Sequence, residues 1–430
     1  MIQKLNAVKT LSGTVYLPGD KSISHRYAML ASIAEGESVI SHFAASRDCH
    51  STLGCLSALG VELKEDGDTV VIQGRGLRGL RAPEKTLDAE NSGTTIRLLS
   101  GILAGHDFEC VITGDDSLSN RPMGRITQPL RLMGASIESR ERDLPPLKIR
   151  GGFLKGTRYT LPVASAQVKS CVLFAGLYGD GTTAVEEIIP TRDHTEIALR
   201  EFGGNVRVSG NWIEVDPEPQ LRARRLAVPG DLSGAAFFLA AAALVPGSDI
   251  TLPGVSLNGR RRELLNYLER AGMDIDVERE TEEAGEARGD LRARYSSSFL
   301  KGRLPDIAGA EAAALIDEIP VLAVLGSQTA GGLEISDAGE LRVKESDRIA
   351  AIATNLRAMN AEVTEKPDGL IIKGGRKLRG AEIMTYKDHR IAMAFAVAGL
   401  AAWGETRIHD AECANVSFPD FWTTMQAISR

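Results

Sequence analysis

The chain has 430 residues, of which 43% are hydrophobic and 25% are charged, and its formal net charge is −7. This composition is typical of a globular protein and excludes a disordered or collagen-like chain. The acidic balance and the aromatic content of 5% argue against nucleic-acid binding, which usually needs a basic excess or an aromatic stacking surface. The length suggests about two or three domains.

The five cysteines are odd in number, and no pair has the CxxC spacing. This favours reduced thiols and indicates neither a disulfide framework nor a zinc site. Residues 1–20 lack the apolar core of a secretory signal, and the longest apolar run, residues 235–246, is too short to span a bilayer. We therefore expect a cytoplasmic protein without a membrane partner.

In chain order, the first feature is a motif that returns later. Gly19 and Gly230 each begin a Gly-Asp-x-Ser motif, which is followed by an Ala/Leu-rich helical segment, a glycine and a strand-like segment. Weaker copies start near four further residues: Asn91, Ser165, Asp317 and Asp388. The six copies have a period of roughly 70 residues, which indicates an internally repeated fold.

Each copy also contains a second, amphipathic helical segment. Five of these segments end at residues that suit the left-handed position after a helix, namely Gly60, Gly134, Gly203, Gly272 and Asn360. With the strand-like segments between them, the copies predict an α/β fold of six βαβαββ units. We expect residues 20–229 to form one domain of three units, and residues 1–19 with 230–430 to form the other, with hinges near Gly19 and Gly230.

Two segments are predicted to be structurally ordinary. Residues 276–303 are highly charged, which favours a solvated hairpin or loop over a partner-binding arm. Residues 74–79 match GxGxxG, but Pro83 stands where a dinucleotide site would need a helix. A plain turn is therefore the better interpretation of this second segment.

Polar and cationic residues gather where the first helix of each copy begins. Helix N-termini attract phosphate and carboxylate. At any single helix start, simple N-capping explains the polar residue. Five helices with such side chains at the same position relative to their start predict an anion-binding site. The residues are Lys21, Ser22 and Arg26; Asn91, Gly93 and Arg97; Ser165, Ala166, Gln167 and Lys169; Asp317; and Asp388, His389 and Arg390.

Two further segments add cations and a carboxylate. Lys344 and Arg348 lie one helical turn apart with Glu345 beside them; alone, this pattern would be a surface ion pair before a capped helix. Arg121 stands in a rigid segment before Pro122; alone, this would be an ordinary loop.

Seven motifs in this order, LPGDKSISHR, NSGTTIR, SNRPMGR, SAQVKS, IDEIP, ELRVKESDR and YKDHRIAMAFA, resemble 5-enolpyruvylshikimate-3-phosphate synthases (3-phosphoshikimate 1-carboxyvinyltransferases) of the bacterial branch often called class II. The resemblance covers residues 17–420. It implies transfer of the enolpyruvyl group of phosphoenolpyruvate to the 5-hydroxyl of shikimate 3-phosphate, with release of phosphate, in the pathway to the aromatic amino acids. It also implies a glyphosate target that needs no metal or organic cofactor, and two similar domains of three βαβαββ units each, an inside-out α/β barrel.

The resemblance assigns roles to individual residues. Asp317 is implied as the base for the 5-hydroxyl and Glu345 as the acid for the C3 methylene, with Lys21 assisting; two carboxylates in different environments can hold such opposite roles. The implied contacts of shikimate 3-phosphate are Lys21, Ser22, Arg26, Ser165, Ala166, Gln167, Thr191, Asp317 and Lys344. Those of phosphoenolpyruvate are Lys21, Gly93, Arg121, Gln167, Arg348 and Arg390.

We expect a monomer whose domains close around the substrates. Three of the assigned cations lie in each predicted domain, and only Asp317 and Glu345 oppose them in this assignment. Like charges repel, so the unliganded domains should stand apart until shikimate 3-phosphate, which carries about three negative charges, draws them together.

Four positions depart from the better-known class I pattern: Val416 replaces a lysine, Ala166 and Thr191 replace serines, and Glu340 replaces an asparagine. They bear on affinity and inhibitor response rather than on the reaction. One alternative is a UDP-N-acetylglucosamine enolpyruvyl transferase, but that family has a cysteine on a mobile loop, and here no cysteine lies between residues 110 and 171. Another is a non-catalytic anion-binding paralogue, which the presence of all three implied catalytic residues disfavours.

Overall fold

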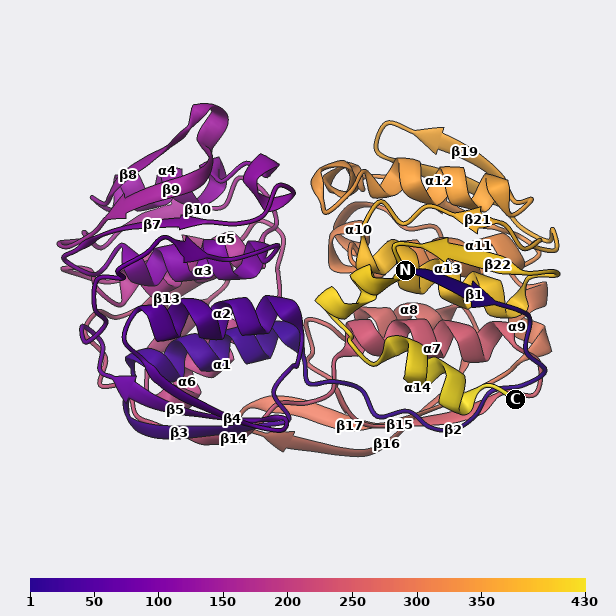
Figure 1. Ribbon diagram of the computed structural model, residues 1–430, viewed down its shortest axis with the longest axis horizontal. Helices are drawn as coiled ribbons and strands as arrows, with labels where there is room; N and C mark the ends of the chain where they lie inside the picture. Colours follow the sequence, from indigo (N-terminus) through magenta and orange to yellow (C-terminus); the bar gives the residue numbers. More distant parts are fainter. The chain divides into compact units, whose positions relative to one another are not determined.

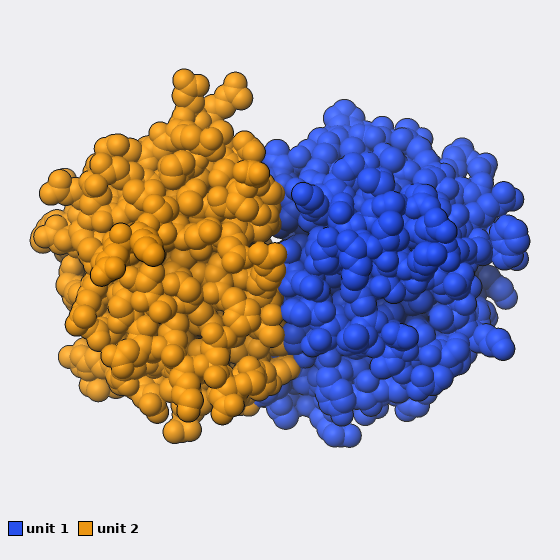
Figure 2. Space-filling model, in the orientation of Figure 1, with its two compact units in different colours: residues 1–18, 229–282, 287–430 blue, residues 19–228, 283–286 orange.

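The computed structural model describes residues 1–430, and the chain divides into two compact units (Figure 2). Unit 1 comprises residues 1–18, 229–282 and 287–430, and unit 2 comprises residues 19–228 and 283–286. From the repeat we expect crossings at residues 19/20 and 229/230, and the chain passes between the compact units at 18/19 and 228/229. No helix has both the length and the apolar character needed to cross a membrane.

Unit 2 contains three four-stranded sheets. Their strands are β3 (Glu35–Ser41), β4 (Glu62–Asp66), β5 (Thr69–Arg75), β6 (Leu87–Asp88), β7 (Glu109–Thr113), β8 (Ser136–Arg140), β9 (Leu144–Arg150), β10 (Arg158–Thr160), β11 (Thr183–Glu186), β12 (Val206–Ser209), β13 (Trp212–Val215) and β14 (Arg225–Ala227). The strand orders are β14-β3-β5-β4, β6-β7-β9-β8 and β10-β11-β13-β12. In each sheet the first two strands are parallel and the others antiparallel.

The helices of unit 2 pack against one another inside these sheets (Figure 1). They are α1 (Lys21–Ile33), α2 (Arg47–Ala58), α3 (Gly93–Leu103), α4 (Gly124–Leu132), α5 (Ala166–Gly176) and α6 (His194–Phe202). α3 and α5 approach so closely that a Cβ atom at Gly101 would lie 2.2 Å from the carbonyl oxygen of Cys171. Glycine at this position therefore permits the contact.

Unit 1 also contains three sheets. Their strands are β1 (Ile2–Leu5), β2 (Ser12–Thr14), β15 (Asp249–Ser256), β16 (Asp274–Glu283), β17 (Glu286–Arg294), β18 (Leu333–Ile335), β19 (Glu362–Lys366), β20 (Gly369–Lys373), β21 (Glu382–Ile383) and β22 (Thr406–His409). The strand orders are β16-β17-β15-β2, β18-β20-β19 and β1-β22-β21. The helices are α7 (Leu232–Leu244), α8 (Glu263–Arg270), α9 (Ser297–Lys301), α10 (Gly309–Ala314), α11 (Ile319–Gln328), α12 (Arg348–Ala358), α13 (His389–Ala401) and α14 (Phe421–Ile428).

The βαβαββ pattern is contiguous in two of the six copies, those built on β6–β9 and β10–β13. Elsewhere a strand from another part of the chain completes the sheet: β14 pairs with β3, β2 pairs with β15, and β1 pairs with β22. In the sheet of β18 the first strand is reduced to the bridge between Ile307 and Ile335. A hydrogen-bonding edge can be satisfied by any strand that reaches it, so a local repeat in sequence does not require a local sheet.

Local signals in the sequence predicted the ends of the helices well. Gly60, Gly134, Gly203, Gly272 and Asn360 all have positive φ, between 73° and 108°, after α2, α4, α6, α8 and α12. The charged segment forms the hairpin of β16 and β17, one of the two structures expected for it. Residues 74–79 form the end of β5 and a turn, and no helix follows them.

Candidate active site

The polar residues at the first helices act as N-caps. Asp20 accepts a hydrogen bond from the backbone N of Ile23 at 3.0 Å, and Asp388 accepts one from that of Arg390 at 2.9 Å. Ser92 and Ser165 cap α3 and α5 in the same way. These caps explain the local sequence, and they fix the neighbouring cationic residues at the first turn of each helix.

Lys21 is the first residue of α1, and its ammonium group is held by a carboxylate that the sequence reasoning missed. Lys21 Nζ lies 2.8 Å from Asp48 Oδ2, and the Asp48 side chain is 9% exposed. Asp48 lies in the first turn of α2, where its only sequence signal was that of an ordinary helix start. The pair sets the direction of the Lys21 side chain.

Arg26 is almost fully buried and is oriented by three helices. Its Nε donates to Thr195 Oγ1 at 2.6 Å, Nη1 donates to the Ser22 carbonyl at 2.8 Å and Nη2 donates to Ser170 Oγ at 2.9 Å. Desolvation lowers the pKa of Arg26 to about 10, and the Glu196 carboxylate opposes this effect. The guanidinium therefore stays charged at neutral pH, with N–H groups left for an anion.

A second group of polar and cationic side chains in unit 2 surrounds the start of α3. Arg121 Nη2 donates to Asn91 Oδ1 at 2.9 Å, and Gln167 Oε1 accepts from Arg97 Nη1 at 2.6 Å. A Cβ atom at Gly93 would lie 2.8 Å from Arg97 Nη1 and 3.6 Å from Arg121 Nη1. Two guanidinium groups thus lie beside a residue without a side chain at a helix N-terminus, where an anion is favoured.

Ser165 and Thr191 differ in the donors that they can offer. Ser165 Oγ accepts from the backbone N of Val168 at 3.4 Å as the cap of α5, which leaves its hydroxyl proton to donate. The backbone N of Thr191 donates to Glu187 Oε1 at 3.1 Å, and its hydroxyl donates to the same oxygen. Only the Thr191 hydroxyl would have to turn away from Glu187 to donate to a phosphate group, while the backbone bond to Glu187 can remain. Ala166, the first residue of α5, offers no side-chain donor.

In unit 1 three carboxylates surround Arg348, which is 1% exposed. Asp388 Oδ2 lies 2.8 Å from Nε, Glu345 Oε2 lies 2.6 Å from Nη2, and Asp317 Oδ1 lies 3.6 Å from Nη1. Desolvation lowers the pKa of Arg348, but the Asp388 and Glu345 carboxylates outweigh it and leave the pKa raised. Arg348 Nη1 is buried without a hydrogen-bond acceptor, so it can still donate to an anion.

Asp317, Arg390 and Lys344 complete this cluster. Arg390 Nη1 donates to the Asp317 carbonyl at 2.7 Å, and its Nη2 lies 3.8 Å from Asp317 Oδ2. The Asp317 side chain is 18% exposed, so a hydroxyl group of a ligand can reach it. Burial lowers the pKa of Lys344, and Asp317 opposes this effect only in part.

The structure adds carboxylates to the two that the sequence placed beside the assigned cations. In unit 1 the three cations Lys344, Arg348 and Arg390 face Asp388 and Glu318 in addition to the two expected carboxylates, and in unit 2 Asp48 faces Lys21. Asp388 was recognised only as the start of a helix, because a cap and a buried counter-ion look the same in sequence. Within each unit, the assigned cations therefore have more counter-ions than the sequence suggested.

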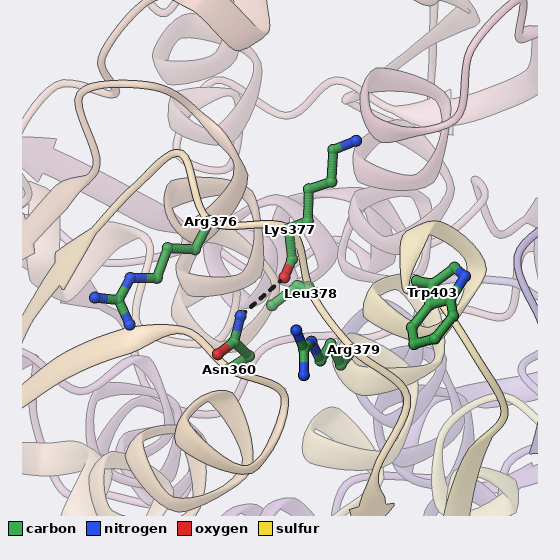
Figure 3. A pocket seen from close by; sticks show the side chains of 6 residues that line it. All are labelled: Asn360, Arg376, Lys377, Leu378, Arg379 and Trp403. Atoms are coloured by element: carbon green, nitrogen blue, oxygen red, sulfur yellow. Dashed lines mark hydrogen bonds between the residues drawn. The ribbon is translucent and has the colours of Figure 1, made fainter.

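A pocket of about 450 Å³ lies elsewhere in unit 1, after the C-terminal ends of α12 and α13 (Figure 3). It is lined by Asn360, Arg376, Lys377, Leu378, Arg379 and Trp403. The backbone N of Arg379 donates to the carbonyl of Met359 at the end of α12, and three other copies repeat this contact: Arg81 to Leu59, Lys155 to Met133 and Arg222 to Phe202. Cations are favoured at helix C-termini. The repeated fold therefore accounts for Arg379 at this place, and we assign no ligand to the pocket.

A family model for EPSP synthase (3-phosphoshikimate 1-carboxyvinyltransferase) matches residues 5–425. The chain belongs to the EPSP synthase family. This confirms the resemblance seen in the seven motifs, and it decides against the sister family considered as the alternative.

Relatives and solved structures agree with this family. The chain is 52% identical over 429 residues to the 3-phosphoshikimate 1-carboxyvinyltransferase of Solibacter usitatus, with 100% of both chains covered. It is 51% identical over 415 residues to that of Pelotomaculum thermopropionicum, covering 96% of this chain and 95% of the relative. A 2.37 Å structure of the EPSP synthase from Acinetobacter baumannii matches with a TM-score of 0.88 and 41% identity, covering 100% of this chain and 98% of that one. The predicted fold class is thereby confirmed.

Within each unit of this EPSP synthase family member, some of the residues assigned from the motifs are in contact. In unit 2, Arg26 is bonded to Ser22 and to α5 and α6, and Gln167 is bonded to Arg97 of α3, whereas Lys21 pairs with Asp48 and Thr191 with Glu187. In unit 1, Asp317, Glu345 and Arg348 form one cluster with Asp388. The residues that the motifs did not reveal are mainly the buried partners that hold these side chains.

Proposed function

We propose that this chain transfers the enolpyruvyl group of phosphoenolpyruvate to the 5-hydroxyl of shikimate 3-phosphate and releases inorganic phosphate. The observation that carries the proposal is the cluster of unit 1. There, two carboxylates suited to moving protons, Asp317 and Glu345, are held beside the buried guanidinium of Arg348, which retains an unsatisfied donor. Membership of the EPSP synthase family over nearly the whole chain supports the same reaction.

Shikimate 3-phosphate binds through its two anionic groups and its ring hydroxyls. Arg26 and Ser22 hold the carboxylate, since a guanidinium grips a carboxylate with two parallel hydrogen bonds. Ser165 and the backbone at the start of α5 hold the phosphate, with Thr191 nearby. Asp317 and Lys344 contact the ring hydroxyls. The proposed site also includes Ala166, Gln167 and Lys21.

Phosphoenolpyruvate binds among cations. A phosphate and a carboxylate need several donors, and arginine supplies them in a planar fork. The proposed contacts are Lys21, Gly93 through its backbone, Arg121, Gln167, Arg348 and Arg390.

The reaction is an addition followed by an elimination. Asp317 takes the proton of the 5-hydroxyl while the hydroxyl oxygen attacks C2 of phosphoenolpyruvate. Glu345 delivers a proton to C3, which gives a tetrahedral intermediate. Glu345 then takes a proton back from the new methyl group as the C2–C3 double bond re-forms, the bond from C2 to the phosphate oxygen breaks, and phosphate departs with the proton that Asp317 gives up. Lys21 assists the proton transfers, and the arginines stabilise the negative charge that develops. No step calls for a metal or an organic cofactor.

Phosphate release tests the proposal directly. The chain is incubated with phosphoenolpyruvate and either shikimate 3-phosphate or UDP-N-acetylglucosamine as acceptor. Release with shikimate 3-phosphate alone is expected. Release with the other acceptor would point to the sister activity, and binding of shikimate 3-phosphate without release would point to a non-catalytic paralogue. We also expect the chain to act as a monomer in the cytoplasm, which size-exclusion chromatography and cell fractionation would check.

A further inference from the structure

A row of buried charges in unit 2 takes no part in the proposed chemistry. Lys169 on α5 is fully buried, and its Nζ lies 3.1 Å from Glu187 Oε1 and 2.5 Å from Glu196 Oε1. The two glutamates are 5% and 2% exposed. Charged side chains are rarely buried unless they are paired, and here one lysine holds two carboxylates that come from different elements.

One end of the row reaches the segment that carries Thr191. Glu187 follows β11, and it accepts hydrogen bonds from both the backbone N and the hydroxyl of Thr191. These two bonds close the turn that leads from β11 into α6. Through Glu187, the position of Lys169 is tied to that of Thr191.

The other end of the row reaches Arg26. Glu196 lies beside Thr195 on α6, and Thr195 Oγ1 accepts from Arg26 Nε at 2.6 Å. Ser170, the residue after Lys169 on α5, lies 2.6 Å from Thr195 Oγ1 and accepts from Arg26 Nη2 at 2.9 Å. The ion pair between Lys169 and Glu196 therefore fixes α5 and α6 at the point where both hold the Arg26 guanidinium.

We propose that Lys169, Glu187 and Glu196 are positioning residues that fix Arg26 and the Thr191 segment relative to each other, and so set the affinity for shikimate 3-phosphate. This inference rests on the proposed function, because Arg26 and Thr191 are assigned to that substrate. Their spacing has to match the distance between the carboxylate and the phosphate of one rigid ring. The contacts assigned to phosphoenolpyruvate at the start of α3 lie outside this row of charges.

Two substitutions separate positioning from simple electrostatics. Lys169→Met removes a positive charge and Glu187→Gln removes a negative one, so electrostatics alone predicts weaker binding of the anionic substrate for the first and tighter binding for the second. Positioning predicts weaker binding for both. We expect the Kd for shikimate 3-phosphate, measured by titration calorimetry without phosphoenolpyruvate, to rise by about tenfold or more in each variant.

The matched control is Lys148→Met, which removes a lysine from a surface pair with Glu109 in the same unit, where the two side chains are 41% and 50% exposed. Its Kd should stay within about twofold of that of the unchanged chain. In the kinetic assay the KM for shikimate 3-phosphate should rise in Lys169→Met and Glu187→Gln while the KM for phosphoenolpyruvate stays nearly constant. Lys169→Arg, which keeps the charge, should recover part of the loss.

Tighter or unchanged binding by a folded Glu187→Gln variant would overturn the proposal, as would equal rises in both KM values. If Lys169→Met does not fold by circular dichroism, Glu187→Gln alone decides, because it keeps the pair of Lys169 and Glu196. If the protein without substitutions releases phosphate and both variants bind shikimate 3-phosphate as tightly as it does, the positioning role is refuted and the proposed function stands. An unchanged chain that neither binds this substrate nor releases phosphate would refute the function itself.

Discussion

Replacing Asp388 by asparagine tests whether the buried carboxylate holds the Arg348 cluster together. Asp388 is fully buried, and its two oxygens serve four donors: Arg348 Nε at 2.8 Å, Arg348 Nη2 at 3.3 Å, Ser346 Oγ at 3.0 Å and the backbone N of Arg390 at 2.9 Å. Asparagine has one acceptor oxygen, and its NH₂ group would face a donor on one side. It can cap α13 or accept from Arg348, but it cannot replace both carboxylate oxygens.

The expected loss of unfolding free energy in Asp388→Asn follows from the burial of the ion pair. Breaking a buried ion pair typically costs about 3–5 kcal/mol. Because Glu345 still lies 2.6 Å from Arg348 Nη2, we expect a loss near the lower end, about 3 kcal/mol of unfolding free energy. The control is Asp347→Asn. Asp347 caps α12 and pairs with Arg342 at 2.8 Å, but its side chain is 40% exposed, so its loss should cost less than about 1 kcal/mol.

Urea unfolding followed by tryptophan fluorescence measures this difference. Trp403 and Trp422 lie in unit 1 and Trp212 lies in unit 2, so a Trp212→Phe background makes the signal report on unit 1 alone. The removal of Trp212 affects parent and variants equally and cancels in the comparison. If Asp388→Asn and Asp347→Asn differ by less than about 0.5 kcal/mol, the reasoning from the buried charge is wrong.

Four further predictions concern the reaction. Asp317→Asn should cut turnover by at least about 10²-fold and leave binding of shikimate 3-phosphate largely intact; turnover above about a third of the starting value would mean that another group is the base. Gly93→Ala should raise the KM for phosphoenolpyruvate and weaken inhibition by glyphosate, because the new methyl would lie 2.8 Å from Arg97 Nη1; tighter inhibition would show that Gly93 is misassigned. Activity should persist in EDTA, and loss that Mg²⁺ or Zn²⁺ restores would contradict the cofactor-free mechanism. Small-angle scattering should show a smaller radius of gyration at saturating shikimate 3-phosphate, and an unchanged value would defeat domain closure.

The sequence by itself determined the features that depend on neighbouring residues. Helix starts and ends follow from caps and from left-handed positions, such as Ser92 before α3 and Gly203 after α6, because these satisfy backbone groups within one turn. The motifs identified the family, and with it the residues assigned to the substrates. They could do so because each motif is a run of neighbouring residues, which can be recognised without knowledge of the fold.

Only the tertiary structure decided which buried groups hold those residues. Arg26 meets Thr195, Lys169 meets Glu196, and Arg348 meets Asp388 across long stretches of chain. In the sequence these partners look like ordinary caps or helical residues, because the amino-acid type does not show whether a charged side chain is buried or exposed. Their role depends on desolvation, which exists only once the helices pack. The strands β1, β2 and β14 could also be placed in their sheets only from the folded chain, because each pairs with a strand that lies far away in the sequence.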